Sequence, residues 1–177
     1  MPDLFFITLI SVFLTIHIES FFLILQIKGQ YLSKWFGKYA FLFHAAVTIN
    51  LWIITFILIF FLQLQPHPRF HTHLLLRSAG FFICLAGIII AIWGFSLLGL
   101  KRALCINFYK QDVPLVKHSI YTYIKNPLDT GLWTALFGFA LFTGSLYNLI
   151  IAAEFVLVMI PHIWLENKPL IKKIKKS

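Results

Sequence analysis

Long apolar runs are the feature that most limits what this chain can fold into. Those over residues 4–27, 39–62 and 74–98 exceed the ~20 apolar residues that cross the core of a bilayer. Two shorter runs, 130–143 and 147–164, are separated by a tight glycine–serine turn. A backbone in lipid must satisfy its own hydrogen bonds, so the runs are expected to be helices. The sequence therefore predicts an all-α, polytopic membrane bundle of about five helices, whose last two form a hairpin.

Composition supports a single membrane domain that covers residues 1–177. Charged residues make up 12% of the chain, about half of the usual share in soluble domains. No basic residue precedes the first apolar run, which is also longer than the ~7–15 residues of a signal-peptide core. We therefore expect a retained helix there. Cys84 and Cys105 suggest neither a disulfide framework nor a paired metal site.

The basic residues predict how the bundle is oriented. All Lys and Arg residues except Arg69 and Arg77 occur in the loop after the first run, in the long loop 99–128 or in the tail 166–177. The positive-inside rule then places the N-terminus outside and the C-terminus in the cytoplasm. We therefore expect the net charge of +9 to orient the protein in the membrane and to contact anionic lipid headgroups, and not to bind nucleic acid.

Polar residues near the predicted cytoplasmic face form a candidate site. Pro127 biases Asn126 away from helical geometry, so a helix should begin there and carry Asp129 in its first turn. His162 and Glu166 are four residues apart and share one helix face. A carboxylate at this depth is costly unless it meets a cation. It therefore either reaches the interface and the tail lysines or binds a cationic ligand.

Together these motifs resemble a known family. The chain reads Tyr121-x-x-x-Lys125-Asn126-Pro127-x-Asp129-x-Gly131, then a hairpin, then Glu166-Asn167-x-x-Leu170. This is similar to the membrane methyltransferases of the isoprenylcysteine carboxyl methyltransferase and phospholipid N-methyltransferase group, with Arg-His-Pro-x-Tyr-x-Gly and Glu-Glu-x-x-Leu. The resemblance covers about residues 93–170. Lys125, Asn126, Asp129 and Asn167 depart from that pattern.

The resemblance implies a cytoplasmic S-adenosylmethionine pocket and a lipid or lipidated methyl acceptor. Glu166 would meet the amino group of the cofactor, Lys125 or Arg102 its carboxylate, and Tyr121 and Tyr123 its adenine or sulfonium. The full set of expected cofactor-binding residues is Arg102, Tyr121, Tyr123, Lys125, Asn126, Pro127, Asp129, Gly131, His162, Glu166 and Asn167. No catalytic residue is assigned, because positioning carries most of methyl transfer.

Two other functions remain open at this stage. The Asn-Pro variant is also similar to membrane sterol reductases that use NADPH, and the substitutions would equally suit a non-catalytic protein with a degenerate site. The acceptor could be an isoprenylcysteine-like carboxylate, a phospholipid amine or a thiol. No obligate protein partner is evident, and a bacterial or archaeal cytoplasmic membrane is favoured over the endoplasmic reticulum.

The remaining polar residues are expected to form contacts between helices. Glu19 and His44 should form a hydrogen-bonded pair between the first two helices, or line the substrate pocket. Glu154 should pair with Arg77 near the outer side. The tract His67-x3-His71-x-His73 has a spacing that could bind metal, but a short histidine-rich tract is compositional support only. No metal site is predicted.

Overall fold

The computed structural model describes residues 2–109, 116 and 118–174. Its long helices are α1 (Pro2–Gly29), α3 (Ala40–Gln63), α4 (Leu74–Leu98), α6 (Pro127–Thr143) and α7 (Leu146–Ile174). Its short elements are α2 (Tyr31–Phe36), α5 (Leu100–Ala103) and the 3-10 turns η1 (Gly37–Tyr39), η2 (Ile106–Phe108) and η3 (Ser119–Thr122). No strand occurs in this described part, so the predicted all-α bundle is confirmed.

The helix lengths agree with a protein that spans a membrane. Within the described residues, four segments are long and apolar enough to cross a bilayer: Asp3–Gly29, Tyr31–Gln63, Leu74–Leu98 and Leu146–Glu166. The remaining predicted span, 130–143, corresponds to α6, which has 17 residues and is therefore about 25 Å long. It lies at the short end of the range for a spanning helix.

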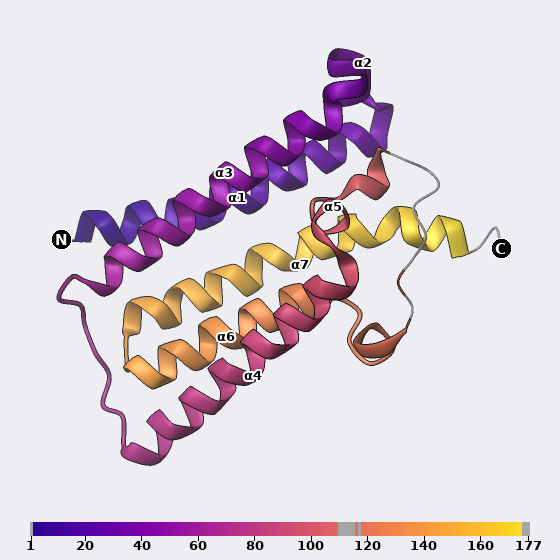
Figure 1. The fold of residues 1–177 in the computed structure, drawn as a ribbon. Coiled ribbons are helices and arrows are strands. Elements are labelled where there is room, and N and C mark those ends of the chain that lie inside the picture. The colour runs from indigo at the N-terminus through magenta and orange to yellow at the C-terminus, as the bar shows by residue number, and fades with distance from the viewer. Residues whose placement is uncertain (1, 110–115, 117, 175–177) are drawn as a thin grey trace.

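The helices form two groups that meet along α1 and α7. In Figure 1, α1 and α3 run side by side, and α4, α6 and α7 form the second group. A buried apolar cluster that includes Val12, Ile16, Leu62, Ile151 and Phe155 joins the two groups. The start of α1 and the end of α7 lie at opposite ends of the bundle (Figure 1).

Close glycine packing joins α4 to α6. A Cβ atom on Gly131 would lie 2.4 Å from the backbone nitrogen of Ala91, and one on Gly138 would lie 2.2 Å from that of Cys84. Real Cβ contacts do not occur at such distances, so only glycine lets the two backbones approach this closely. Membrane helices commonly use small residues in this way.

The turn between α6 and α7 is held by the loop before α4. Gly144 ends α6 in the left-handed region, with φ of 66°, where glycine carries no steric penalty. The backbone N–H of Phe70 donates to the Gly144 carbonyl at 2.8 Å, and that of Leu146 donates to the Pro68 carbonyl at 3.0 Å. The predicted helical hairpin is therefore confirmed.

One predicted ion pair at this end of the bundle is wrong. The Arg77 Nε–H donates to Thr72 Oγ1 at 2.8 Å. The Oε2 atom of Glu154 is buried without a hydrogen-bond partner among the described residues. Arg77 and Glu154 belong to α4 and α7, and α6 packs on both of these helices.

Among the described residues, no three or more His, Cys, Asp or Glu side chains are grouped so as to hold a metal ion.

Candidate functional site

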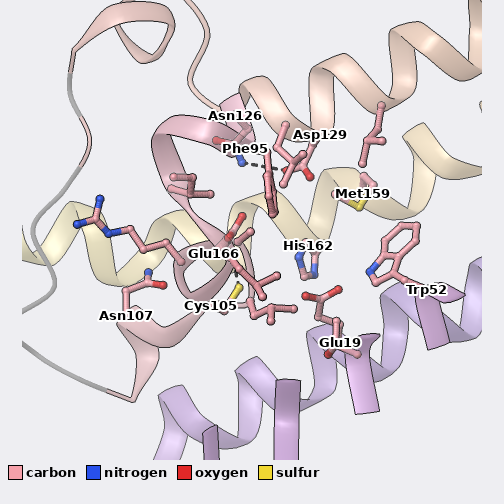
Figure 2. A pocket seen from close by; sticks show the side chains of 18 of the residues that line it. Glu19, Trp52, Phe95, Cys105, Asn107, Asn126, Asp129, Met159, His162 and Glu166 are labelled. Carbon is pink, nitrogen blue, oxygen red and sulfur yellow. Dashed lines mark hydrogen bonds between the residues drawn. The ribbon is translucent and has the colours of Figure 1, made fainter. Parts of the chain in front are cut away.

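A cavity of about 510 Å³ lies between the two helix groups, where α4 ends and α6 begins (Figure 2). This volume is within the usual range for small-molecule sites, about 300–1,000 Å³. The ionisable or hydrogen-bonding side chains of its wall include Glu19, Thr48, Arg102, Asn107, Tyr121, Lys125, Asn126, Asp129, His162 and Glu166. The wall thus combines three acidic side chains, Glu19, Asp129 and Glu166, with two basic ones, Arg102 and Lys125.

The first turn of α6 supplies one carboxylate. Pro127 begins the helix, where its missing N–H costs no hydrogen bond. Its ring packs against α4 at Gly94, where an added Cβ would lie 2.9 Å from the ring. Asn126 Nδ2 donates to Asp129 Oδ2 at 3.4 Å, drawn as a dashed line in Figure 2. Packing of Pro127 and this hydrogen bond together fix where the Asp129 carboxylate lies in the cavity wall.

A buried thiol holds a second carboxylate. Cys105 adopts a left-handed conformation with φ of 61°, and its side chain is 1% exposed. Its S–H donates to Glu166 Oε1 at 3.4 Å. Burial, followed by the negative charges of Glu166 and Glu19, raises the pKa of the Cys105 thiol well above its usual range. The thiol therefore stays protonated and can serve as a steady donor to Glu166.

Tyr121 provides an aromatic part of the wall. Its hydroxyl donates to the Gly94 carbonyl at 3.2 Å, which ties the turn η3 to α4. Partial burial raises the pKa of Tyr121 to about 12, with smaller contributions from the charges of Asp129 and Glu166. The phenol is consequently neutral throughout the physiological range.

The segment after α5 is fastened to the first helix group. Tyr109 Oη and His44 Nδ1 lie 2.7 Å apart in a hydrogen bond. Gln26 Nε2 donates to Ser33 Oγ at 2.7 Å and to the Phe108 carbonyl at 3.4 Å. These bonds connect the segment to α1 and α3. They thereby help to fix the position of Cys105, which donates to Glu166 of α7.

A second cavity, of about 220 Å³, lies beside the first and has an almost wholly apolar wall. Both cavities are lined by Trp52, Phe56 and Leu132, and the other residues of the second are almost all aliphatic or aromatic. The edge of the first cavity carries exposed apolar side chains of α3 and α4, including Ile53 and Phe95. The cavity is thus open between these two helices, on a surface that would face lipid.

A family model of phospholipid methyltransferases matches residues 76–176, more than half of the chain. The chain belongs to this family. Membership implies a membrane methyltransferase that acts on lipid substrates. The match includes nearly all of α4 and the whole of α6 and α7, but neither α1 nor α3. No curated protein and no solved structure matches the chain.

The structure of this phospholipid methyltransferase family member brings most of the predicted site residues to the cavity. Those in its wall are Arg102, Tyr121, Lys125, Asn126, Asp129, His162 and Glu166. Tyr123 is not among them, because its side chain is 89% exposed and lies outside the wall. Pro127 and Gly131 contact α4 and act through packing. The side chain of Asn167 is outside the described residues.

Glu19 is a wall residue that the predicted site set lacked. The expected pair between Glu19 and His44 is wrong, because His44 instead bonds Tyr109 while Glu19 lines the cavity. The expected alternative, a place in the pocket, agrees with the structure. A carboxylate inside an apolar span is in itself a signal of a functional site, and this signal could have added Glu19 to the set.

Proposed function

We propose that this protein transfers a methyl group from S-adenosylmethionine to a lipid or lipidated acceptor. The observation that carries the proposal is that two unlike cavities share part of their walls. One holds charges of both signs beside aromatic rings, and the other is apolar and shares Trp52, Phe56 and Leu132 with it. A charged, water-soluble ligand suits the first cavity, and a hydrocarbon chain suits the second.

The chemistry of the wall fits S-adenosylmethionine. This cofactor carries an ammonium, a carboxylate and a sulfonium, and so has a net positive charge. The wall offers groups of both signs to meet them, the carboxylates of Asp129 and Glu166 and the basic side chains of Arg102 and Lys125. Glu166 would bind the ammonium, and Arg102 or Lys125 the carboxylate, by charge-assisted hydrogen bonds. Tyr121 would offer its ring to the adenine or the sulfonium.

The residues of this chain would act chiefly by binding and orientation. When bound, S-adenosylmethionine supplies an electrophilic methyl group. The Cys105 hydrogen bond orients Glu166, and the Asn126 hydrogen bond orients Asp129. Holding two reactants in a fixed geometry can remove about 7–11 kcal/mol of a barrier, so the transfer itself requires little beyond a deprotonated acceptor.

Calorimetric titration of the purified protein in detergent tests the proposal. We expect heat of binding with S-adenosylmethionine and with S-adenosylhomocysteine, and none with NADPH. Absence of heat with both adenosyl compounds, in a sample whose circular dichroism shows intact helices, would contradict the proposal and favour a non-catalytic protein. Binding of NADPH in their place would favour a reductase.

Glu166→Gln tests the site at one residue. The substitution keeps the shape but removes the charge that would pair with the ligand ammonium, so we expect affinity for S-adenosylhomocysteine to fall about tenfold or more. Glu154→Gln is the matched control, because it makes the same change on the same helix, outside both cavities. Equal affinity in the two variants would remove Glu166 from the binding site.

A further inference from the structure

Glu19 is a buried carboxylate that the proposed binding of the cofactor does not use. Its side chain is 7% exposed and lines the cavity from α1. It lies ten residues before the end of α1 at Gly29, which corresponds to about 15 Å along the helix. Ionisable groups at such depth are expensive and are found where a ligand or a partner requires them.

The surroundings of Glu19 differ from those of the other two carboxylates. Figure 2 shows its carboxylate pointing toward the imidazole of His162 and the indole nitrogen of Trp52. His162 Nδ1 is itself held by Ser20 Oγ at 2.9 Å, a hydrogen bond that joins α7 to α1. Glu166 and Asp129 are instead held by Cys105 and by Asn126.

Trp52 marks the place where a lipid acceptor would carry its reactive group. It lines the polar cavity and the apolar one, so a chain in the apolar cavity would end beside it. The group attached to that end would then lie next to Glu19. Glu19 belongs to α1, whereas Glu166 belongs to α7 and Lys125 to the segment before α6; the proposed binding assigns only the last two to the cofactor.

Building on the proposed methyl transfer, we infer that Glu19 contacts the acceptor's reactive group and selects a nitrogen that carries protons over a carboxylate. A carboxylate acceptor beside Glu19 would bring two like charges together in a medium of low dielectric constant, where their repulsion is large. An ammonium or amine would instead donate a charge-assisted hydrogen bond to Glu19.

The contact also supplies a place for the proton of the acceptor. An ammonium has no free electron pair with which to attack a methyl group. Transfer of one proton from the ammonium to the Glu19 carboxylate leaves a neutral amine and a neutral carboxyl group, so charge and atoms balance. Glu19 would thereby both position the nitrogen and free its electron pair, as a residue that touches the substrate.

Lipid binding measured without turnover tests this inference. Native mass spectrometry of the whole protein, with S-adenosylhomocysteine bound, would compare three probes with the same acyl chain: a lysophospholipid with an ethanolamine headgroup, one with a glycerol headgroup, and the free fatty acid. We expect the ethanolamine lipid to bind the wild-type protein most tightly. Preference for the fatty acid, or no preference, would overturn the inference.

Glu19→Gln should reduce the preference for the ethanolamine probe over the glycerol probe by about tenfold, with binding of S-adenosylhomocysteine unchanged. Glu154→Gln, the same change outside both cavities, should keep the preference. If Glu19→Gln does not fold, Glu19→Asp retains the charge on a shorter side chain and should weaken the preference without reversing it.

Undiminished preference in whichever Glu19 variant folds would overturn the inference about Glu19 alone. Failure of the wild-type protein to bind S-adenosylhomocysteine would instead count against the proposed function. The two failures are therefore distinguishable.

Discussion

At the scale of single residues, the cavity wall depends on hydrogen bonds that fix charged groups before any ligand arrives. Cys105 holds Glu166, and Asn126 holds Asp129. Each donor comes from the segment between α4 and α6, whereas Glu166 comes from α7. The bond from Cys105 therefore makes the position of a helix side chain depend on how that segment folds.

The buried state of Cys105 predicts slow alkylation. Because its pKa is raised, its thiolate fraction near pH 8 is far below that of an ordinary thiol. In the Cys84→Ala variant, where Cys105 is the remaining cysteine, iodoacetamide should react at least about tenfold more slowly with native than with denatured protein. The rate should rise as pH increases above 9. Mass spectrometry would follow the reaction, and equal native and denatured rates would contradict the burial.

The sequence predicted a shared location for those cavity-wall residues whose positions follow from local rules. Asp129 lies in the first turn after a proline, and His162 and Glu166 share a helix face, so their placement needed no tertiary information. Glu19 was not assigned to the cofactor site because its neighbours, Trp52 and His162, belong to helices far away in the sequence. Tyr121 lines the cavity, whereas Tyr123, just after the turn η3, is exposed; sequence spacing alone does not separate the two.

At the scale of elements, α4 and α6 behave as one unit. Their backbones touch at successive glycines. The helices α1 and α3 pack on each other and make a second unit. The polar cavity lies between the α4–α6 unit and the α1–α3 unit. Stability of the α4–α6 pair therefore determines the shape of one whole wall.

Gly138→Ala should separate α4 from α6. The new methyl group would meet the Cys84 backbone nitrogen at 2.2 Å, and overpacking of this kind costs about 1–3 kcal/mol. We expect a lower midpoint of thermal unfolding by circular dichroism. Gly29→Ala is the control, because its methyl group would meet only the movable ring of Tyr31. A midpoint as high as that of the control would contradict the packing.

The helix boundaries were largely predictable, with one instructive exception. Apolar runs located α1, α3 and α4 to within a few residues, because hydrophobic thickness limits their length. The last span was expected to end at about Trp164, which agrees with the apolar segment Leu146–Glu166, but the helix α7 itself continues to Ile174. A helix extends as far as its backbone hydrogen bonds continue, also beyond the apolar run. Hydropathy alone therefore does not predict where the helix ends.

At the scale of the whole molecule, the two ends of the bundle differ in charge. Lys28, Lys34, Lys38 and Lys101 lie at or near the ends of helices on the same side as α2 and α5 (Figure 1). Arg69 belongs to the loop between α3 and α4 at the opposite end. By the positive-inside rule, the end that is richer in lysine and arginine is expected to face the cytoplasm.

Site-directed labelling tests that orientation. In a background of Cys84→Ala and Cys105→Ala, an impermeant maleimide should label Lys101→Cys from the cytoplasmic side only and His71→Cys from the other side only. Both positions are exposed, so accessibility within the protein does not limit either reaction. Labelling with the opposite sidedness would reverse the orientation and the compartment assigned to the cavity.

The opening of the cavity between α3 and α4 determines which concentration scale sets the occupancy of each ligand. A lipid that enters there never leaves the bilayer, so its mole fraction in the membrane, and not its molar concentration in the suspension, sets how often it is bound. A water-soluble ligand in the same cavity obeys the ordinary molar scale. Dilution with inert lipid would therefore empty one half of the cavity while leaving the other half as full as before.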